Sequence, residues 1–284
     1  MADNIVIQGV SDPSPLLEQL SLLTGCSDHV RIFDRPAFRF HNGKINTALL
    51  EFCLEHQLDC ATTPSGRELK LFGLVAFDMD STLIDIETID ELAGIAGVRE
   101  QTAQLTERAM CGEIDFESSF RQRIALLKGL PVSALETVNE QKLRFNPGAE
   151  CLIQEVQRQG LKTALITSGF EYFAERLKSR LELDYAVYNR VGIRDGCLTG
   201  EISGKLIDAR GKANTLEAYR INLGLSNKQV IAIGDGANDL AMLDMAGISI
   251  AWHAKPLVRK QATHALNFVG LDGVLNLFEQ ARQT

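Results

Sequence analysis

The stretch Leu74-Val75-Ala76-Phe77-Asp78-Met79-Asp80-Ser81-Thr82-Leu83 joins a short apolar run to two carboxylates. Four consecutive apolar residues are typical of a strand buried on both faces of a parallel sheet. Asp78 and Asp80 follow directly, and a spacing of two residues in an extended chain sends both side chains the same way. Open α/β sheets bind ligands at the carboxyl ends of their strands, so this stretch predicts a fold class and the place of a site.

Similar apolar runs recur downstream, at 164–166, 230–233 and 248–251, with helical patterns between them. This alternation predicts βα units around a central parallel sheet, a Rossmann-like α/β core that occupies residues 71–284. Residues 88–145 break the rhythm with helical patterns only, and we interpret them as a helical insertion after the first core strand. Residues 185–207 indicate a hairpin that turns at 194–196.

The first 70 residues have a different pattern and no cluster of catalytic side chains. Short strands are expected at 5–7 and within 30–40, and helices at 14–24 and 45–54, with a boundary in the turn-forming stretch Thr62-Thr63-Pro64-Ser65-Gly66. We predict a small N-terminal α/β domain over residues 1–70, with a regulatory or dimerisation role. A homodimer is therefore left open.

The composition of the 284 residues excludes several classes of protein. With 45% hydrophobic and 23% charged residues, the chain is neither disordered nor a small disulfide scaffold. A net charge of −8 without a basic stripe argues against a nucleic-acid partner. There is no apolar run of about 18 residues, so no membrane helix is expected. The N-terminus lacks signal-peptide character, and six scattered cysteines without a C-x-x-C pair favour thiols in the core over disulfides or a zinc site, so we expect a cytoplasmic protein.

A second acidic motif, Gly234-Asp235-Gly236-Ala237-Asn238-Asp239, follows the apolar run at 230–233. Carboxylates at the ends of two different strands suit Mg²⁺, which prefers oxygen ligands and keeps waters and a substrate phosphate oxygen. No Gly-Lys-Ser/Thr follows the glycines, so this is not a nucleotide-binding P-loop.

Two weaker signals complete the set. Thr167-Ser168-Gly169 follows the run at 164–166, and a hydroxyl with backbone N–H groups at the start of a helix can bind phosphate oxygens. Lys212 adds a cation, although a single lysine is usually a surface charge. Together the four signals supply a nucleophile, an acid/base, metal ligands and phosphate donors. These are the groups that phosphoryl transfer through an aspartyl-phosphate requires.

These blocks resemble the haloacid dehalogenase superfamily, and within it the phosphoserine phosphatase family. The resemblance runs from about Leu74 to about Leu266 and also covers Glu87–Glu91 and Phe116–Pro131. It implies a Rossmann-like core with a small helical cap at about 88–145. It also implies Mg²⁺-dependent hydrolysis of O-phospho-L-serine to L-serine and phosphate through an aspartyl-phosphate, the last step of serine biosynthesis.

The resemblance also implies roles for single residues. Asp78 would be the nucleophile and Asp80 the general acid and then the base, while Asp78, Asp80 through its carbonyl and Asp235 would bind Mg²⁺, with Asp239 in support. Thr167, Ser168, Gly169, Lys212 and Asn238 would surround the phosphate, Glu87 and Arg123 would bind the amino and carboxylate groups of serine, and Met110 and Phe116 would be apolar walls. Ser168 stands where the family commonly has glycine, which adds bulk beside the phosphate.

The assignment of Arg123 has an independent argument. At 100° per residue, Arg123 falls on the apolar stripe formed by Phe116, Phe120, Ile124 and Leu127, whereas Arg121 faces away. An arginine on a buried stripe needs an anion. A substrate carboxylate would supply it, and so would an acid within the protein.

Other functions remain as alternatives. The nearest is a phosphatase of the same superfamily that acts on another small phosphomonoester. A sensor that keeps the fold without catalysis would have lost an essential acid, yet every acid of the motifs is present. A receiver-like signalling domain would need neither a cap of about 60 residues nor Asp80.

Overall fold

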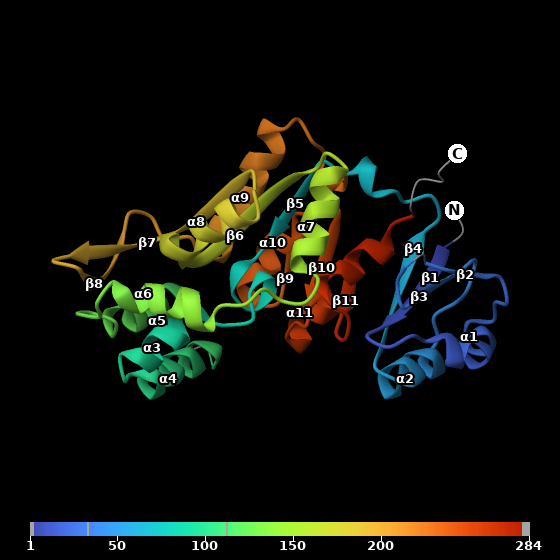
Figure 1. Ribbon diagram of the computed structural model, residues 1–284, viewed down its shortest axis with the longest axis horizontal. Coiled ribbons are helices and arrows are strands. Elements are labelled where there is room, and N and C mark those ends of the chain that lie inside the picture. Colours follow the sequence, from blue (N-terminus) through green and yellow to red (C-terminus); the bar gives the residue numbers. More distant parts are fainter. Residues whose placement is uncertain (1–2, 33, 112, 280–284) are drawn as a thin grey trace.

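The computed structural model describes residues 3–32, 34–111 and 113–279, and three parts of it lie in a row in Figure 1. The N-terminal elements lie at one end, a mostly parallel sheet with its helices lies in the middle, and the helices that follow β5 lie at the other end beside the β7–β8 hairpin. Within the described residues, no helix is long and apolar enough to cross a membrane.

The N-terminal part is an antiparallel sheet covered by two helices. Its elements are β1 (Asp3–Gly9), a helical turn (Ser14–Leu16), α1 (Leu17–Thr24), β2 (His29–Arg31), β3 (Ala37–Phe40), α2 (Thr47–Glu55) and β4 (Leu58–Pro64), and the strand order is β2-β3-β1-β4. Helix α1 ends at Gly25, whose φ of 66° is the left-handed conformation that glycine adopts readily. The expected turn at 62–66 is wrong in its first part, because 62–64 pair with β1 and only Ser65 and Gly66 turn.

The central sheet contains all four strands that the apolar runs predict. Its strands are β5 (Leu74–Phe77), β6 (Lys162–Phe170), β7 (Tyr185–Arg194), β8 (Cys197–Ser203), β9 (Val230–Gly234), β10 (Ile248–Trp252) and β11 (His264–Leu266), in the order β11-β10-β9-β5-β6-β7-β8. Neighbouring strands are parallel except for the β7–β8 hairpin, which turns where expected. Strand β11 was not predicted, because three residues give no periodic signal.

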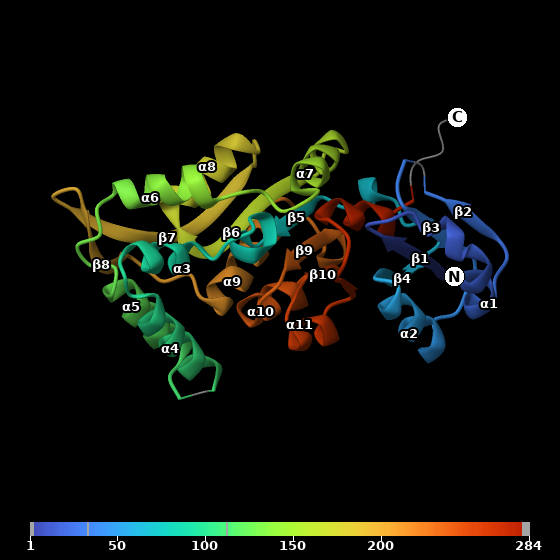
Figure 2. The same cartoon turned by 60° about the horizontal axis from the view of Figure 1, so that its bottom comes forward.

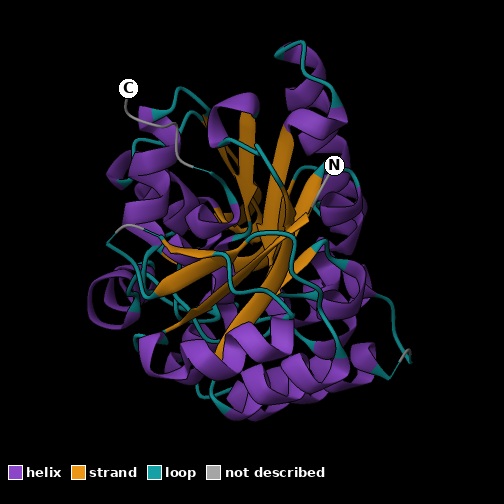
Figure 3. Cartoon of the chain, turned by 90° about the vertical axis from the view of Figure 1, so that its right-hand side faces the viewer, coloured by secondary structure: helices purple, strands orange, loops and turns teal. Residues whose placement is uncertain are grey.

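Helices cover both faces of this sheet (Figure 3). Val75 and Phe77 pack in one hydrophobic cluster with α7 (Ala149–Arg158) and α8 (Glu171–Arg180). Leu74 and Ala76 face the other way, into a cluster with α9 (Ala209–Asn222), α10 (Leu240–Asp244) and α11 (Pro256–Gln261). Because alternate residues of β5 meet opposite clusters, the strand needs an unbroken apolar run, which is the pattern that the sequence shows.

The insertion after β5 is helical, as predicted. It consists of α3 (Thr88–Ile95), α4 (Arg99–Met110), α5 (Phe116–Ala125), α6 (Ser133–Thr137) and a helical turn (Val138–Lys142). In Figure 2 these helices lie beside the β7–β8 hairpin. Two hydrogen bonds fix that contact, from Gly129 N to Leu198 O at 2.8 Å and from Val132 N to Gly196 O at 2.9 Å. These hydrogen bonds therefore hold the helical insertion against the β7–β8 hairpin.

Polar side chains attach the N-terminal sheet to the rest of the chain. Arg39 donates two hydrogen bonds of 2.8 Å to the carbonyls of Asn276 and Phe278. The carboxylate of Asp59 accepts hydrogen bonds from the backbone nitrogens of residues 267, 268 and 269 at 2.6, 3.0 and 3.1 Å. Arg39 and Asp59 are both buried, so these bonds hold the two sheets in a defined relative position. All six cysteines are free thiols, as expected, but the expected core position is wrong for most of them, because only Cys53 is buried and both Cys111 and Cys151 are exposed.

Candidate active site

Asp78 begins the site at the end of β5. Its backbone nitrogen donates to the carbonyl of Ile233, so the ends of β5 and β9 lie side by side. Its Oδ1 accepts hydrogen bonds from Met79 N at 2.7 Å and from Lys212 Nζ at 2.6 Å. The residue is 4% exposed. Burial and then Asp239 raise the pKa of Asp78 well above its usual value, while Lys212 opposes that rise.

Lys212 is wholly buried between two carboxylates. Besides Asp78, its Nζ contacts Asp239 Oδ1 at 2.7 Å. Asp208 caps helix α9 by accepting from Gly211 N at 2.7 Å, and this cap sets the start of the turn that carries Lys212. Burial lowers the pKa of Lys212, but the two carboxylates outweigh it and the pKa ends above its usual value. The lysine is therefore a fixed cation, not a surface charge.

Three carboxylates gather around this cation. Oxygens of Asp78, Asp235 and Asp239 lie within 4.8 Å of one another, and all three residues are buried. Burial and then Asp239 raise the pKa of Asp235 to about 7. Asp239 uses both of its oxygens, because Oδ1 accepts from Lys212 and Oδ2 accepts from the nitrogens of Asp235 and Gly236 at 3.1 Å each. Asp239 thus positions the lysine and the loop after β9.

The oxygens that remain suit a hard cation. Asp235 Oδ1 accepts from the hydroxyl of Thr82 at 3.1 Å. In the described part of the chain, no hydrogen bond reaches the second oxygen of either Asp78 or Asp235. Two crowded, buried carboxylates that each keep a free oxygen match the oxygen-only ligand set of a divalent ion such as Mg²⁺. The cluster can bind a metal, and Asp78 and Asp235 are the residues placed to hold it.

Asp80 lies in the loop Met79–Leu83 that follows Asp78. Its carboxylate accepts hydrogen bonds from Thr88 N at 3.1 Å and from the Thr88 hydroxyl at 3.3 Å, at the start of α3. Burial and then Glu87 raise the pKa of Asp80 to about 8. A carboxyl group with that pKa holds a proton at neutral pH, which is the state a general acid requires.

The end of β6 approaches the same loop. A Cβ on Gly169 would lie 2.4 Å from Met79 Cε and 3.1 Å from Asp80 Oδ2, so a larger residue here would require the Met79 side chain to move. The expectation that 167–169 open a helix is wrong, because β6 continues to Phe170 with a shifted register and α8 begins at Glu171. Gly169 N donates to Thr167 Oγ1 at 2.8 Å, which leaves the threonine hydroxyl hydrogen available to another acceptor.

Ser168 turns its hydroxyl away from this edge. It donates to the carbonyl of Ile207 at 2.8 Å, and Asn189 donates to the Ser168 carbonyl at 2.8 Å. The departure from glycine therefore joins β6 to the segment that precedes α9. Asn238 is half-buried in the loop after β9, next to Gly236.

Arg123 and Glu87 face the site from the helical insertion. Burial lowers the pKa of Arg123, while the carboxylates of Asp90, Glu87 and Asp80 oppose this, which places those acids around the guanidinium. Arg123 Nε is buried without a hydrogen-bond partner in the described structure. The guanidinium carbon lies 5.6 Å from the ring centre of Phe120. The prediction that the Arg123 side chain points toward the interior is therefore confirmed.

The other residues that the sequence analysis singled out near Arg123 differ in how far they are buried. Glu87 is exposed and accepts a hydrogen bond from the Ser81 hydroxyl at 2.7 Å. Arg121 is exposed and paired with Glu117 at 2.7 Å. Phe116 is half-buried, with its ring centre 5.7 Å from that of Phe120. The side chain of Met110 lies outside the described residues.

Several supporting residues escaped the sequence analysis. Thr82 and Thr88 hold the carboxylates of Asp235 and Asp80, and both were visible beside the quoted motifs. Asn146 and Asn189 gave no signal, because each is a single amide far along the chain from the loop that it holds.

Comparison with known proteins agrees with this geometry. A model of the haloacid dehalogenase-like hydrolase family matches residues 75–244, which contain every acid of the candidate active site. The chain is 42% identical over 257 residues to a phosphoserine phosphatase of Haemophilus influenzae, covering 89% of this chain and 82% of that protein. It is 48% identical over 217 residues to one of Polaromonas sp., covering 74% and 92%.

A solved structure extends the similarity to nearly the whole chain. The unliganded crystal structure of a probable phosphoserine phosphatase from Vibrio cholerae superposes with a TM-score of 0.84 at 36% identity, and covers 97% of this chain and 86% of that one. The N-terminal sheet is therefore part of the shared architecture.

Proposed function

The chain belongs to the haloacid dehalogenase-like hydrolase family, and on that premise we propose that it is a Mg²⁺-dependent phosphatase that hydrolyses O-phospho-L-serine to L-serine and phosphate, the last step of serine biosynthesis. The observation that carries the proposal is the buried pair of Asp78 and Lys212, with a free Asp78 oxygen and with Asp80 in the adjoining loop. A nucleophile and an acid/base are thereby held on one loop.

The reaction follows from these positions. One oxygen of the Asp78 carboxylate attacks phosphorus while the other stays with its charge partners, the bond between phosphorus and the serine oxygen breaks, and Asp80 gives its proton to that serine oxygen. Asp80, now ionised, takes a proton from water as the water attacks the aspartyl-phosphate, which releases phosphate and regenerates Asp78. Lys212 and the Thr167 hydroxyl bind phosphate oxygens. A Mg²⁺ ion held by Asp78, Asp235 and the Asp80 carbonyl, with Asp239 in support, would neutralise charge on the phosphate.

The helical insertion is proposed to select the substrate. The unpartnered Nε of Arg123 supports a role in binding the serine carboxylate, because a buried guanidinium favours a planar anion. Glu87, on the same side, would bind the serine ammonium, with Phe116 and Met110 as apolar walls. Gly169 and Asn238 would complete the phosphate environment, while Ser168 takes part through its backbone, since its hydroxyl is engaged by Ile207.

The domain division is also a proposal. Two hydrophobic clusters support a small domain over residues 1–70 and a phosphatase domain over 71–284 with its cap at 88–145, and Ala61 and Leu69 of the first segment pack in the cluster of the second. The small domain contributes none of the acids of the site, which supports a regulatory or dimerisation role for it. A cytoplasmic location, function without a nucleic-acid or membrane partner, and a homodimer stay predictions.

The decisive experiment is the change Asp78→Asn, because an amide cannot form the acyl-phosphate. Rapid quenching with radiolabelled phosphoserine is expected to leave label on the unchanged protein and none on the variant, with turnover lost. Asp244→Asn, an exposed acid on α10, is the matched control and should keep both label and turnover. Stable label on the Asp78→Asn variant, or equal turnover in both variants, would remove Asp78 from the reaction.

A further inference from the structure

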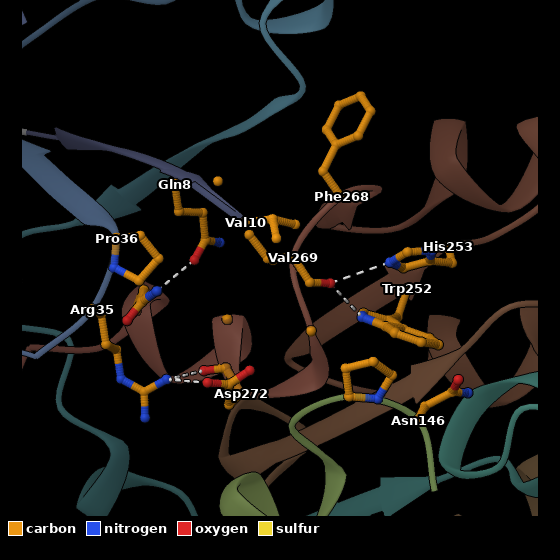
Figure 4. Close-up of a pocket in the computed structure, with 15 residues that line it drawn as sticks. Gln8, Val10, Arg35, Pro36, Asn146, Trp252, His253, Phe268, Val269 and Asp272 are labelled. Atoms are coloured by element: carbon orange, nitrogen blue, oxygen red, sulfur yellow. Dashed lines mark hydrogen bonds and ion pairs between the residues drawn. The ribbon is translucent and has the colours of Figure 1, made fainter. Parts of the chain in front are cut away.

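A cavity lies between the N-terminal sheet and the central sheet (Figure 4). Its volume of about 400 Å³ falls in the range of small-molecule sites, which is roughly 300–1,000 Å³. Gln8 at the end of β1 and Arg35 before β3 line it from one side, and Trp252 and His253 at the end of β10 line it from the other. None of these residues belongs to the candidate active site.

Two buried amides in this cavity are only half satisfied. Gln8 and Asn276 are 1% and 3% exposed, and Asn276 Nδ2 donates to Gln8 Oε1 at 2.5 Å. Gln8 Nε2 and Asn276 Oδ1 are buried without a hydrogen-bond partner in the described structure. In Figure 4 the amide nitrogen of Gln8 points toward the side on which Val269 and Trp252 lie. An unpaired buried donor and acceptor are costly, so the pair calls for an occupant that supplies one acceptor and one donor.

The remaining walls restrict the charge of that occupant. Arg35 and Asp272 form an ion pair of 2.8 Å, so the cavity has one cation and one anion that already compensate each other. Trp252 Nε1 and His253 Nε2 both contact the carbonyl oxygen of Val269, at 3.1 and 3.2 Å, and the two rings form a wall of the cavity. A molecule that is neutral overall, with an apolar part, fits such a cavity better than an ion.

Hydrogen bonds connect the cavity to the candidate active site on two sides. Asn146, which lines the cavity, donates to the carbonyls of Thr82 and Ile84 at 2.9 Å each, in the loop that carries Asp80. On the other side, Lys255 N donates to the Asp235 carbonyl at 3.0 Å, two residues after His253. Each wall is therefore joined by a hydrogen bond to a loop that holds carboxylates of the candidate active site.

We propose that this cavity is an effector site for a small molecule that is neutral overall and presents a hydrogen-bond acceptor and a donor side by side. Zwitterionic α-amino acids and primary carboxamides share this chemistry. Gln8 Nε2 donates to the acceptor, Asn276 Oδ1 accepts from the donor, and Trp252 packs on the apolar part. Occupancy alters turnover through Asn146 and the 252–255 segment, and this last effect rests on the proposed function.

The chain offers a direct reporter, because Trp252 is its only tryptophan. The probes are L-alanine and L-asparagine in one arm, and propionamide and succinamide in the other. We expect one arm to change the Trp252 emission saturably, with half-saturation at about 1 mM or below. Gln8→Met removes the donor, and Val10→Phe fills the cavity from an exposed position that folding does not depend on. Both should raise the half-saturating concentration at least about tenfold.

Val30→Phe is the matched control, since Val30 is also an exposed valine of the small domain but lies outside the cavity, and it should bind as the unchanged protein does. If no probe changes the Trp252 emission at concentrations up to about 50 mM, the proposed effector site is refuted and the cavity holds only water. A response that survives in both Gln8→Met and Val10→Phe also overturns it.

The effect on turnover is measured separately, with p-nitrophenyl phosphate at saturation. The binding probe should change kcat of the unchanged protein and not that of Val10→Phe. Binding without a change in kcat refutes the coupling. A protein without any phosphatase activity would refute the proposed function instead, and the emission result would still decide the site.

Discussion

The ammonium group of Lys212 lies 2.6 Å from Asp78 Oδ1, although 134 positions separate the two residues in the chain. The lysine is completely buried and has Asp239 as its other partner. A cation at this place opposes the rise that burial and two neighbouring carboxylates cause in the pKa of Asp78, without cancelling it. Lys212 therefore favours the ionised form of the nucleophile.

Replacing Lys212 with Met should abolish this support. We expect kcat to fall at least about 100-fold, because both the nucleophile and the phosphate lose a buried charge partner. The free energy of unfolding should fall by about 3 kcal/mol, since Asp78 and Asp239 are left unpaired. Steady-state kinetics and urea unfolding measure the two effects. Lys260→Met, at an exposed position on α11, is the control, and a Lys212 variant that resembles it in both assays would contradict this role.

The acidic cluster should make activity depend on a divalent metal. A chelator in excess is expected to abolish turnover, Mg²⁺ to restore it and Ca²⁺ to inhibit, because Ca²⁺ takes more ligands at longer distances. Asp235→Asn removes one charge from the metal site, so the Mg²⁺ concentration for half-maximal activity should rise at least about tenfold. Asp244→Asn should leave the Mg²⁺ titration unchanged. Full activity of the unchanged protein in chelator would exclude the metal.

Arg123→Lys should separate substrate selection from chemistry. A lysine cannot form the planar bidentate contact, so kcat/KM for phosphoserine should fall by an amount equivalent to about 2–5 kcal/mol. p-Nitrophenyl phosphate has no carboxylate and should lose far less. Arg121→Lys, exposed on the same helix, should leave both substrates nearly unaffected.

Measuring kcat/KM for the two substrates on both variants decides the role of Arg123. Equal losses on both substrates for Arg123→Lys would show that this arginine holds the helical insertion in place. Its neighbours Asp90 and Glu87 would then be the anions that it needs.

Acid should destabilise the fold through His264. The residue is 6% exposed, and its Nε2 lies 3.3 Å from Arg67 Nη1, which can donate to the neutral ring. Burial and then Arg67 lower the pKa of His264 to about 4 from its usual 6.5. Between these two values the unfolded chain binds a proton that the folded chain does not. Stability is therefore complete above about pH 6.5 and falls as the pH drops toward 4.

A His264→Gln variant isolates this contribution, because glutamine keeps an acceptor for Arg67 and does not titrate. Urea unfolding at pH 7.5 and 4.5 should show the unchanged protein losing up to about 3 kcal/mol more than the variant over that interval. Identical pH dependence for the two proteins would mean that His264 is protonated as readily when folded as when unfolded.

Much of the fold follows from local patterns in the sequence. The strands β5, β6, β9 and β10 are apolar runs because helices cover both faces of the sheet, and this requirement acts on each strand separately. The carboxylates Asp78 and Asp235 directly follow two such runs, so their meeting at one edge could be expected from topology alone. The inward direction of Arg123 could likewise be derived, since helical periodicity is a local property.

Other features depend on contacts between distant segments. The conformation of 167–169 is decided by Asn189 and Ile207, which hold Ser168 from other elements and keep β6 extended to Phe170. Asp239 could have been taken for a direct metal ligand, but its two oxygens are already occupied by Lys212 and by backbone nitrogens. Which partner occupies each oxygen of Asp239 can be seen only in the folded structure, because these partners come from different segments of the chain.

The α/β class, the helical insertion and the two acidic loops follow from periodicity and strand-end motifs, which are properties of neighbouring residues. The docking of the polar face of β1 against the C-terminal segment, where Gln8 meets Asn276 across 268 positions of chain, depends instead on tertiary contacts. The same contacts leave the cavity between the N-terminal sheet and the central sheet. A buried polar group needs a partner close in space, and the order of residues along the chain does not specify which distant group that partner is.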